Sequence, residues 1–293
     1  MEWMQTMKKT IRYLENHILE DDYDVSKELG ISSYYLQKGF RIITGYSMNE
    51  YVRNRRLYLA ALEIIEDKDK VIDIAYKYGY ETPESFSKAF SRFHGVSPMQ
   101  LKKDSSQLHV FLPLKISIEI QGGNEMDFIV EKMDCFKVIG FESEVSYDTS
   151  YQDIPKLWLD FHQKYMNCLM TKHSENEIEE TILKCHIGMF GICVDASEGK
   201  GHFKYLIAGM YNGEDIPEGM VTYEFPDLTW AKFLSIGQLP TALQAVNTKI
   251  FKEWLPGNPD YDIAMSANIE YYSLGNPESS HYESAIWIPV KSK

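Results

Sequence analysis

The sequence lacks the marks of a secreted or membrane-spanning protein. No apolar run approaches the roughly 18 residues that a transmembrane helix needs, and the opening MEWMQTMKKT holds no apolar core of signal-peptide length. The cysteines form no C-x-x-C pair and follow no metal-binding spacing; they are Cys135, Cys168, Cys185 and Cys193. We therefore expect a cytoplasmic protein with free, buried thiols, without a metal site and without a cofactor.

Arginine is missing from the last two thirds of the chain. Every arginine lies before residue 93, and residues 1–105 hold 16 basic and 16 acidic residues, so the whole net charge of -13 falls on residues 106–293. The planar guanidinium of arginine forms paired contacts with phosphate and guanine. The asymmetry indicates two parts with different partners, the first of them suited to nucleic acid.

Helical periodicity extends through residues 1–103. Apolar residues recur at spacings of three and four, as Ile11, Leu14 and Ile18 do, and glycine or proline separates the periodic runs. We predict an all-α domain over residues 1–105, a linker with an edge strand over 106–126, and a second domain over 127–293.

Two segments of the all-α domain share one design. Each has a short helix, a glycine that can adopt the positive φ of a tight turn, a hydroxyl residue that can cap the next helix, and a second helix. The first consists of Val25–Leu29, Gly30, Ser32 and Tyr34–Ile43, and the second of Val71–Tyr78, Gly79, Thr82 and Glu84–Phe93. In a helix-turn-helix, such a second helix enters the major groove of DNA.

Each second helix has an apolar and a polar stripe. Leu36 and Phe40 in the first, and Phe86, Ala89 and Phe90 in the second, are expected to pack inward. The outward stripes consist of Tyr34, Gln37, Lys38 and Arg41, and of Glu84, Ser85, Lys88 and Arg92. Such side chains either contact bases and phosphates or form an ordinary solvated face, and the repetition of the whole unit favours DNA.

The two units resemble the AraC-type DNA-binding domain. KVIDIAYKYGYETPESFSKAFSRFHGVSPMQLKK is similar to its second unit, and SSYYLQKGFRIITGYSMNEYVRNRRLYLAALEIIE to its first recognition helix and the helix that joins the units. The resemblance implies two helices in successive major grooves of double-stranded DNA. It places Tyr34, Gln37, Lys38, Glu84, Ser85 and Lys88 at base-reading positions, and Arg41 and Arg92 at the backbone.

Three charged residues leave alternatives open. Glu84 at a base-reading position could accept a hydrogen bond from cytosine or could repel phosphate. Arg53 and Arg56 share one side of the joining helix, where they serve either as phosphate contacts or as partners of nearby acids.

Strand-like runs begin after residue 105. Val110–Leu112 and Ile116–Ile120 come first, and a repeat follows in which each half reads strand, turn, strand, helix, strand, strand. The first half covers Asp127–Val145, Ile154–Cys168, His186–Val194 and Phe203–Tyr211; the second covers Val221–Ile236, Thr241–Trp254, Ala264–Tyr272 and Tyr282–Val290. The repeat predicts a two-layer α+β domain with pseudo-twofold symmetry and a pocket where the halves meet.

This domain resembles the GyrI-like small-molecule-binding domain. The similar pieces are PLKISIEIQGG, FKVIGFES, IPKLWLDF, DLTWAKF, IFKEWLP and IWIPVKSK. The resemblance implies an aromatic pocket for a lipophilic or cationic effector, and the candidate aromatic residues are Trp158, Tyr223, Trp230, Tyr271 and Trp287. Each ring could instead belong to an ordinary core.

The charge of the effector depends on acidic residues of the pocket. The family commonly has a glutamate two residues before the aromatic of the W-I-P ending, where this chain has Ala285. Glu283, on the same side of the strand, and Glu270 are the candidates to replace it. If neither enters the pocket, we expect a neutral ligand, because a buried carboxylate needs a partner.

These features predict a transcription regulator that binds double-stranded DNA and responds to a small-molecule effector. RNA polymerase is an expected partner, no membrane is involved, and both a monomer and a homodimer are compatible with the sequence. We expect no enzymatic activity, since no nucleophile–base constellation is evident. The alternatives are a small-molecule hydrolase in the second domain and a ligand-free architectural module.

Overall fold

The computed structural model describes residues 2–20, 24–116, 126, 128–195, 201–213 and 215–293. The chain forms two compact units, Met1–Gly30 with Thr44–Glu119, and Ile31–Ile43 with Ile120–Lys293. We call them the helical unit and the sheet unit. In the described part of the chain, no helix is both long enough and apolar enough to cross a membrane.

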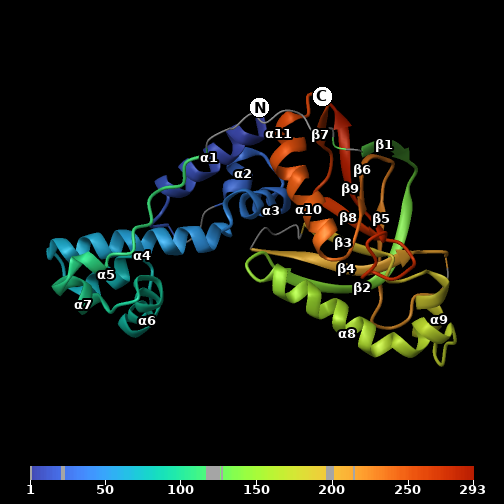
Figure 1. The fold of residues 1–293 in the computed structure, drawn as a ribbon, viewed down its shortest axis with the longest axis horizontal. Helices are drawn as coiled ribbons and strands as arrows, with labels where there is room; N and C mark the ends of the chain where they lie inside the picture. The colour runs from blue at the N-terminus through green and yellow to red at the C-terminus, as the bar shows by residue number, and fades with distance from the viewer. Residues whose placement is uncertain (1, 21–23, 117–125, 127, 196–200, 214) are drawn as a thin grey trace. The chain divides into compact units, whose positions relative to one another are not determined.

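Short and medium helices build the helical unit (Figure 1). They are α1 (Glu2–Asn16), α2 (Val25–Leu29), α4 (Met48–Glu66), α5 (Val71–Lys77), α6 (Pro83–His94) and α7 (Pro98–Lys103), followed by a 3-10 turn at Ser105–Gln107. Helix α3 (Ser33–Thr44) lies between α2 and α4 in sequence, but all of it except its last residue belongs to the sheet unit.

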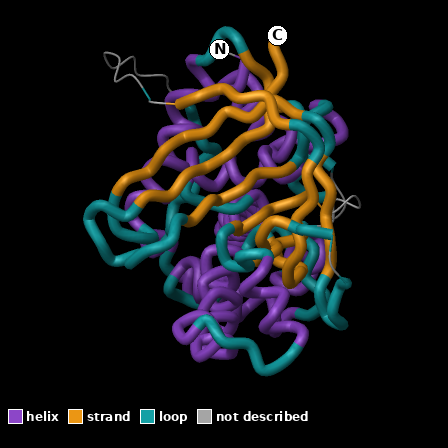
Figure 2. The backbone as a smooth tube through the Cα atoms, turned by 90° about the vertical axis from the view of Figure 1, so that its right-hand side faces the viewer, coloured by secondary structure: helices purple, strands orange, loops and turns teal. Residues whose placement is uncertain are grey.

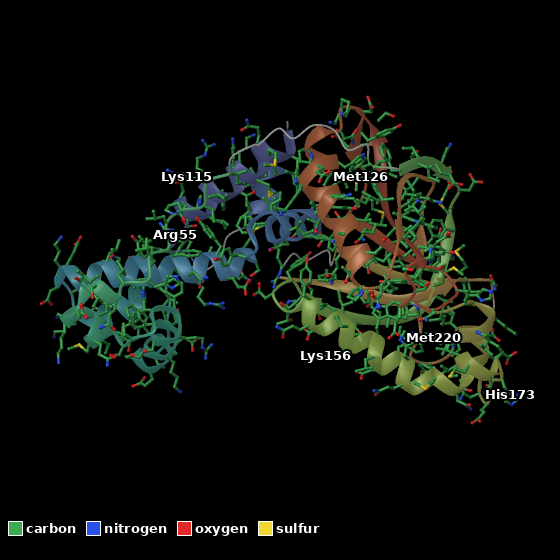
Figure 3. The ribbon with its side chains drawn as sticks, in the orientation of Figure 1. Arg55, Lys115, Met126, Lys156, His173 and Met220 are labelled. Carbon is green, nitrogen blue, oxygen red and sulfur yellow. The ribbon has the colours of Figure 1, made fainter. Side chains whose placement is uncertain are left out.

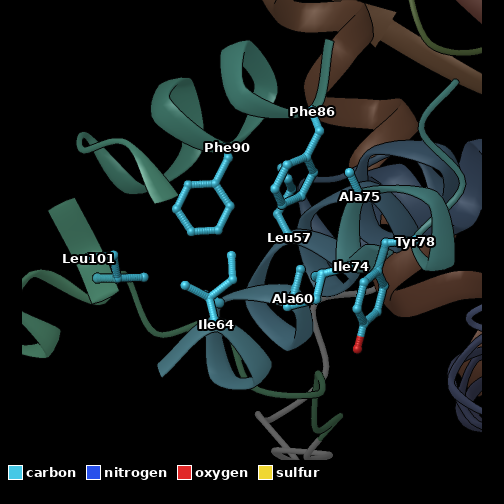
Figure 4. Close-up of a cluster of buried hydrophobic side chains, with 10 residues drawn as sticks. Leu57, Ala60, Ile64, Ile74, Ala75, Tyr78, Phe86, Phe90 and Leu101 are labelled. Atoms are coloured by element: carbon cyan, nitrogen blue, oxygen red, sulfur yellow. The ribbon is translucent and has the colours of Figure 1, made fainter. Parts of the chain in front are cut away.

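An apolar cluster joins α4, α5, α6 and α7 (Figure 4). Leu57 and Ile64 of α4 meet Ile74 of α5 and Phe86 and Phe90 of α6, and each of these side chains is at most 2% exposed. Burial of side chains of this size stabilises a fold by about 1.5–3 kcal/mol each. The predicted inward stripe of the second recognition helix is confirmed at both phenylalanines.

Both helix-turn-helix turns have the predicted geometry. The glycine of each turn adopts a positive φ, 63° in the first and 82° in the second. Ser32 Oγ accepts a hydrogen bond from the Tyr35 N–H (3.3 Å), and Thr82 Oγ1 accepts one from the Ser85 N–H (3.1 Å). The two predicted caps are therefore confirmed.

In its described residues, the sheet unit contains nine strands and the helices that cover them (Figure 1). The first half has β1 (Phe128–Met133), β2 (Phe136–Ser146), α8 (Ser150–Thr171), α9 (Glu177–Lys184), β3 (Phe190–Asp195) and β4 (His202–Met210). The second half has β5 (Val221–Phe225), β6 (Leu228–Ile236), α10 (Thr241–Lys249), a π-helical turn (Ile250–Trp254), α11 (Leu255–Gly257), β7 (Tyr261–Ile263), β8 (Ala267–Tyr272) and β9 (Glu283–Ser292).

The strand order is symmetric about the centre of the sheet. It runs β1-β6-β9-β8-β3-β4-β2-β5, with β7 paired to β9, and the pairs are antiparallel. If each strand is replaced by its counterpart in the other half (β1 by β5, β2 by β6, β3 by β8, β4 by β9, and the reverse), the result is the same order read from the opposite end. The predicted repeat is confirmed, and its pseudo-twofold axis passes between β3 and β8.

The sheet curls until its ends approach each other (Figure 2). Strands β1 and β2 lie near opposite ends of the strand order, yet only Asp134 and Cys135 separate them along the chain. Side chains of one face meet across the curl, since the ring centroid of Phe136 in β2 lies 6.1 Å from that of Trp230 in β6. This face is the concave, inner face of the sheet.

Helices cover the outer face. Phe161 of α8 packs against Phe141 of β2, with ring centroids 6.0 Å apart. Trp254, at the end of the π-helical turn, packs against Phe233 of β6 at 4.9 Å. The two predicted layers are therefore a curled sheet and the helices on its outer side.

Some local predictions were wrong. Val110–Leu112 is not a strand, and Ile116–Ile120 falls mostly outside the described residues. The helix predicted over Ile154–Cys168 begins earlier, at Ser150, so that Pro155 lies inside it. Helix α9 was missed, although Asn176 caps it and acidic residues fill its first turn. Cys135 is exposed, unlike the other three cysteines, which are buried free thiols as expected.

Candidate functional sites

The polar stripe of the second recognition helix faces solvent. Helix α6 exposes all four of its predicted DNA contacts, Glu84, Ser85, Lys88 and Arg92. The Thr82 cap and the buried phenylalanines fix the orientation of this helix. The stripe is therefore open to a partner.

The first recognition helix is covered instead. Tyr34, which was expected to face outward, is only 2% exposed, and Gln37, Lys38 and Arg41 are half-buried. The expectation that Tyr34 faces solvent was wrong, because its side chain packs onto strands more than 150 residues away in sequence. Its ring lies 5.6 Å from that of Phe203 in β4.

Polar contacts hold α3 on the outer face of the sheet. The Tyr34 hydroxyl donates a hydrogen bond to Asn268 Oδ1, and the Tyr35 hydroxyl donates one to the carbonyl of Ala267 (2.6 Å). The Tyr34 N–H donates to a carboxylate oxygen of Asp195 (3.3 Å). Burial raises the pKa of both tyrosines well above its ordinary value, so both hydroxyls remain donors.

Basic side chains extend the contact to both neighbouring helices. Arg41 donates to the carbonyl of Asp148 (3.1 Å) and lies over the Tyr151 ring of α8, 4.9 Å from its centroid. Lys38 Nζ donates to the Tyr34 hydroxyl (3.0 Å) and lies 5.9 Å from the Phe251 ring of the π-helical turn. Helix α3 thus contributes to the outer layer together with the helices of both halves.

Two arginines of the joining helix α4 form hydrogen bonds within the helical unit (Figure 3). Arg55 is buried and donates two hydrogen bonds to the Glu15 carboxylate (2.8 and 2.9 Å). Arg56 donates to the carbonyls of Ile18 and Glu20, beyond the end of α1. These contacts join Arg56 to the backbone of the helical unit.

The seven predicted effector residues do not form one group. Direct pairing across the strands places Tyr223, Trp230, Tyr271 and Trp287 on the inner face. Glu270 points to the outer face, where Trp158 of α8 also lies, and Glu283 is exposed at the start of β9. Since adjacent residues of a strand point to opposite sides, Glu270 and Tyr271 cannot contact the same ligand on one face.

Aromatic rings form a continuous set across the inner face. Trp230 is fully buried, and its ring lies 6.4 Å from that of Trp287, which stacks on Tyr271 at 5.8 Å with an interplanar angle of 20°. Tyr223 packs against Phe225, which touches Trp230 in turn. The buried indole nitrogen of Trp230 has no hydrogen-bond partner among the described residues.

The rim of this inner face is apolar and only partly covered. Partly buried hydrophobic side chains surround the buried cluster, and methionine is frequent among them; they include Met133, Met189, Met210, Met265, Tyr223, Tyr271 and Trp287. Methionine is flexible and polarizable, so such a surface adapts to ligands of different shape. We call this set the aromatic face.

A lysine of the chain itself lies on the aromatic face. Lys232 Nζ stands over the Trp287 ring, 4.0 Å from its centroid, and forms an ion pair with Glu131 (2.5 Å). The Lys232 side chain is 15% exposed and that of Glu131 is 53% exposed. Ala285, directly opposite Tyr271 in β9, leaves no acidic group where the family has its glutamate. The motif DLTWAKF contained this lysine, which the sequence analysis did not single out.

The outer face has a different polar cluster near Glu270. The Tyr272 hydroxyl donates to the Glu270 carboxylate (2.8 Å), and Trp158 Nε1 donates to the Tyr205 hydroxyl (2.7 Å). Burial and the Glu270 charge raise the pKa of Tyr205 and Tyr272 well above its ordinary value. Gly191 makes the close packing possible, since a Cβ there would lie 2.3 Å from the Tyr205 hydroxyl.

A small pocket of about 170 Å³ lies between α8 and strands β2 and β4. Phe141, Phe161, Tyr165 and Tyr205 are among its lining residues, and the buried Tyr165 hydroxyl has no hydrogen-bond partner within the described chain. The pocket is smaller than the ~300–1,000 Å³ of common ligand sites. Across the residues that the structure describes, no group of three or more His, Cys, Asp or Glu side chains could hold a metal ion.

Comparison with known proteins matches two parts of the chain to different families. Residues 129–290 match the family described as integron-associated effector binding protein, and residues 25–104 match a helix-turn-helix domain family. The regulatory protein SoxS of Salmonella typhimurium is 38% identical over 95 residues, which cover 31% of this chain and 88% of SoxS.

Two further proteins are similar to parts of the chain. The HTH-type transcriptional activator AarP of Providencia stuartii is 40% identical over 75 residues, or 26% of this chain and 56% of AarP. The solved structure of SAV2435 bound to tetraphenylphosphonium has 17% identity and a TM-score of 0.46, with 57% of this chain and 94% of SAV2435 covered.

Proposed function

Since the chain belongs to the family of integron-associated effector binding proteins and also carries an AraC-type helix-turn-helix domain, we propose that a small molecule on the aromatic face controls its binding to DNA. Both resemblances found in the sequence are confirmed, and the protein is a DNA-binding transcription regulator with an effector-binding domain. The observation that carries our proposal is the set of partly exposed rings Tyr223, Tyr271 and Trp287 on the concave side of the sheet.

We propose a neutral, lipophilic and aromatic effector. Flat rings gain about 0.5–1.5 kcal/mol per stacked pair beyond their buried area. The place of a cation over Trp287 is taken by Lys232, and Glu270 points to the outer face. Glu283 is on the Trp287 side of β9, but it is exposed at the start of the strand. The chemistry therefore disfavours a quaternary ammonium and favours its uncharged isostere.

The exposed stripe of α6 supports DNA contacts by Ser85, Lys88 and Arg92, with Glu84 beside them. For the first helix, we propose that Tyr34, Gln37, Lys38 and Arg41 contact DNA in a different state of the chain. From the class of regulator we also propose that the protein is cytoplasmic, that it contacts RNA polymerase, and that it is a monomer or a homodimer.

We propose that the second domain is not a hydrolase. Stabilising a developing cation with aromatic rings would require a glutamate that positions water beside them. Glu270 lies on the opposite face from the four inner rings, and Glu131 is paired with Lys232. A probe incubated with the protein should be recovered unchanged by mass spectrometry, and turnover would contradict the assignment.

The test is genome-wide footprinting of the full-length protein, with tryptophan fluorescence titration against neopentylbenzene. We expect a discrete bipartite site and saturable quenching, since Trp230 and Trp287 line the aromatic face. Binding that is uniform along DNA and disappears with salt would contradict sequence recognition. Unchanged fluorescence would contradict the effector site and favour the ligand-free alternative.

A further inference from the structure

The outer face of the sheet binds a surface of α3 that DNA would also need. Tyr34, Lys38 and Arg41, three of the four residues expected to contact DNA from this helix, contact the strands, α8 or the π-helical turn instead. A major groove cannot receive a side chain that is only 2% exposed, as Tyr34 is. The two contacts are mutually exclusive.

The face that receives α3 presents hydrogen-bond acceptors to it. Residues 106–293 carry the whole net charge of -13. Asp195 accepts a hydrogen bond from the Tyr34 N–H, and the Asp148 carbonyl accepts one from Arg41. A basic, aromatic helix surface suited to phosphates and bases therefore also suits these acceptors.

We propose that the sheet unit holds the first recognition helix in an autoinhibited state, in which the outer face of β3, β4 and β8 competes with DNA for α3. This inference rests on the proposed function. The second recognition helix stays exposed in the same state, so the protein can bind half of its site before α3 is released.

The central strands give the effector a route to this contact. In β8, Asn268 and Glu270 face outward while Tyr271 faces the aromatic face. In β3, Cys193 faces α3 while Ile192 belongs to the inner cluster. The strands that contact α3 on their outer side thus carry the aromatic face on their inner side, and an effector with different affinity for the two states changes DNA affinity.

Cys193 reports on the state of α3. It is 4% exposed, lies directly opposite Asn268, the partner of Tyr34, and has a pKa raised to about 12, mainly by burial. Release of α3 exposes this thiol to N-ethylmaleimide. Three internal controls exist in the same chain, since Cys135 is exposed while Cys168 and Cys185 are buried elsewhere.

The experiment measures labelling rates of all four cysteines in the full-length protein by peptide mass spectrometry. Tyr35→Phe removes the hydrogen bond to Ala267 without touching a predicted base contact, and Asn268→Ala removes the acceptor of Tyr34. Ser284→Ala is the matched control, because Ser284 is a fully buried polar residue on the same face.

Each of the two variants should raise the Cys193 rate about two- to tenfold, the effect of one net hydrogen bond, while Ser284→Ala and the rates of Cys168 and Cys185 stay unchanged. Saturation with a DNA fragment bound by the protein should raise the Cys193 rate as well. An unchanged Cys193 rate in both variants overturns the docking, and an unchanged rate in the DNA complex overturns the competition. If the protein binds no DNA, the proposed function fails, while the docking is still decided by the variants.

Discussion

Replacement of Lys232 by methionine should convert the aromatic face from a site that rejects cations into one that accepts them. Lys232 Nζ occupies the position 4.0 Å above Trp287 that a ligand cation would take, and its partner Glu131 lies at 2.5 Å. Lys232→Met keeps the apolar stem, removes the positive charge and leaves the Glu131 carboxylate for a ligand.

The magnitude follows from Coulomb's law. A ligand cation displaced to about 6 Å from the lysine would be repelled by about 2.8 kcal/mol at an effective dielectric constant of about 20. Glu131 cancels part of this repulsion, and its exposure screens the remainder, so about 1.5 kcal/mol is a reasonable net figure. That corresponds to about tenfold in affinity.

The assay is tryptophan fluorescence titration with benzyltrimethylammonium and with neopentylbenzene, which has carbon in place of the nitrogen. The variant should bind the cation about tenfold more tightly than the unaltered protein does, while affinity for the neutral isostere changes less than threefold. Lys132→Met is the control, because Lys132 is an exposed residue on the other side of β1. Equal cation affinity in the two proteins would refute the role assigned to Lys232.

Three further outcomes are expected. Gly191→Ala places a Cβ 2.3 Å from the Tyr205 hydroxyl and should destabilise the sheet unit by about 1–3 kcal/mol in urea unfolding. Gly257→Ala, with open space around its Cβ, should not destabilise it, and equal effects of the two changes would contradict the close packing of Gly191 against Tyr205. Burial lowers the pKa of the His94 imidazole below its ordinary value of 6.5, so its contribution to stability is present above that pH and is lost as the pH falls. The His94→Gln variant should lose this difference in melting temperature between pH 8 and pH 5.5. An unaltered difference would contradict the role of His94. Lys88→Ala should weaken operator binding by about 1–3 kcal/mol with unchanged melting, because the side chain is exposed; undiminished affinity would remove α6 from the interface.

Local features could be predicted from the sequence because their causes are local. The caps Ser32 and Thr82 and the bounds of α2 depend on residues within a few positions of each other. The repeat was detectable because each half needs the same pattern of strands and helices to build its layer. Its consequence, a symmetric strand order, follows from pairing between the halves.

The candidate sites required the structure. Tyr34 is buried by Asn268, which lies 234 positions away, and no periodicity within α3 indicates that contact. The division of the effector residues between two faces was partly available, since Glu270 and Tyr271 are neighbours and must point to opposite sides of a strand. The position of Lys232 over Trp287 depends on the register between β6 and β9, which the sequence does not give.

The most direct test of the account is the affinity of the full-length protein for its footprinted DNA fragment, measured by fluorescence anisotropy with and without saturating neopentylbenzene at one salt concentration. We expect the effector to change the affinity several-fold, and Asn268→Ala to raise the affinity in its absence, because α3 is released from the sheet. An affinity that neither the effector nor the variant changes would show that the sheet unit does not control DNA binding.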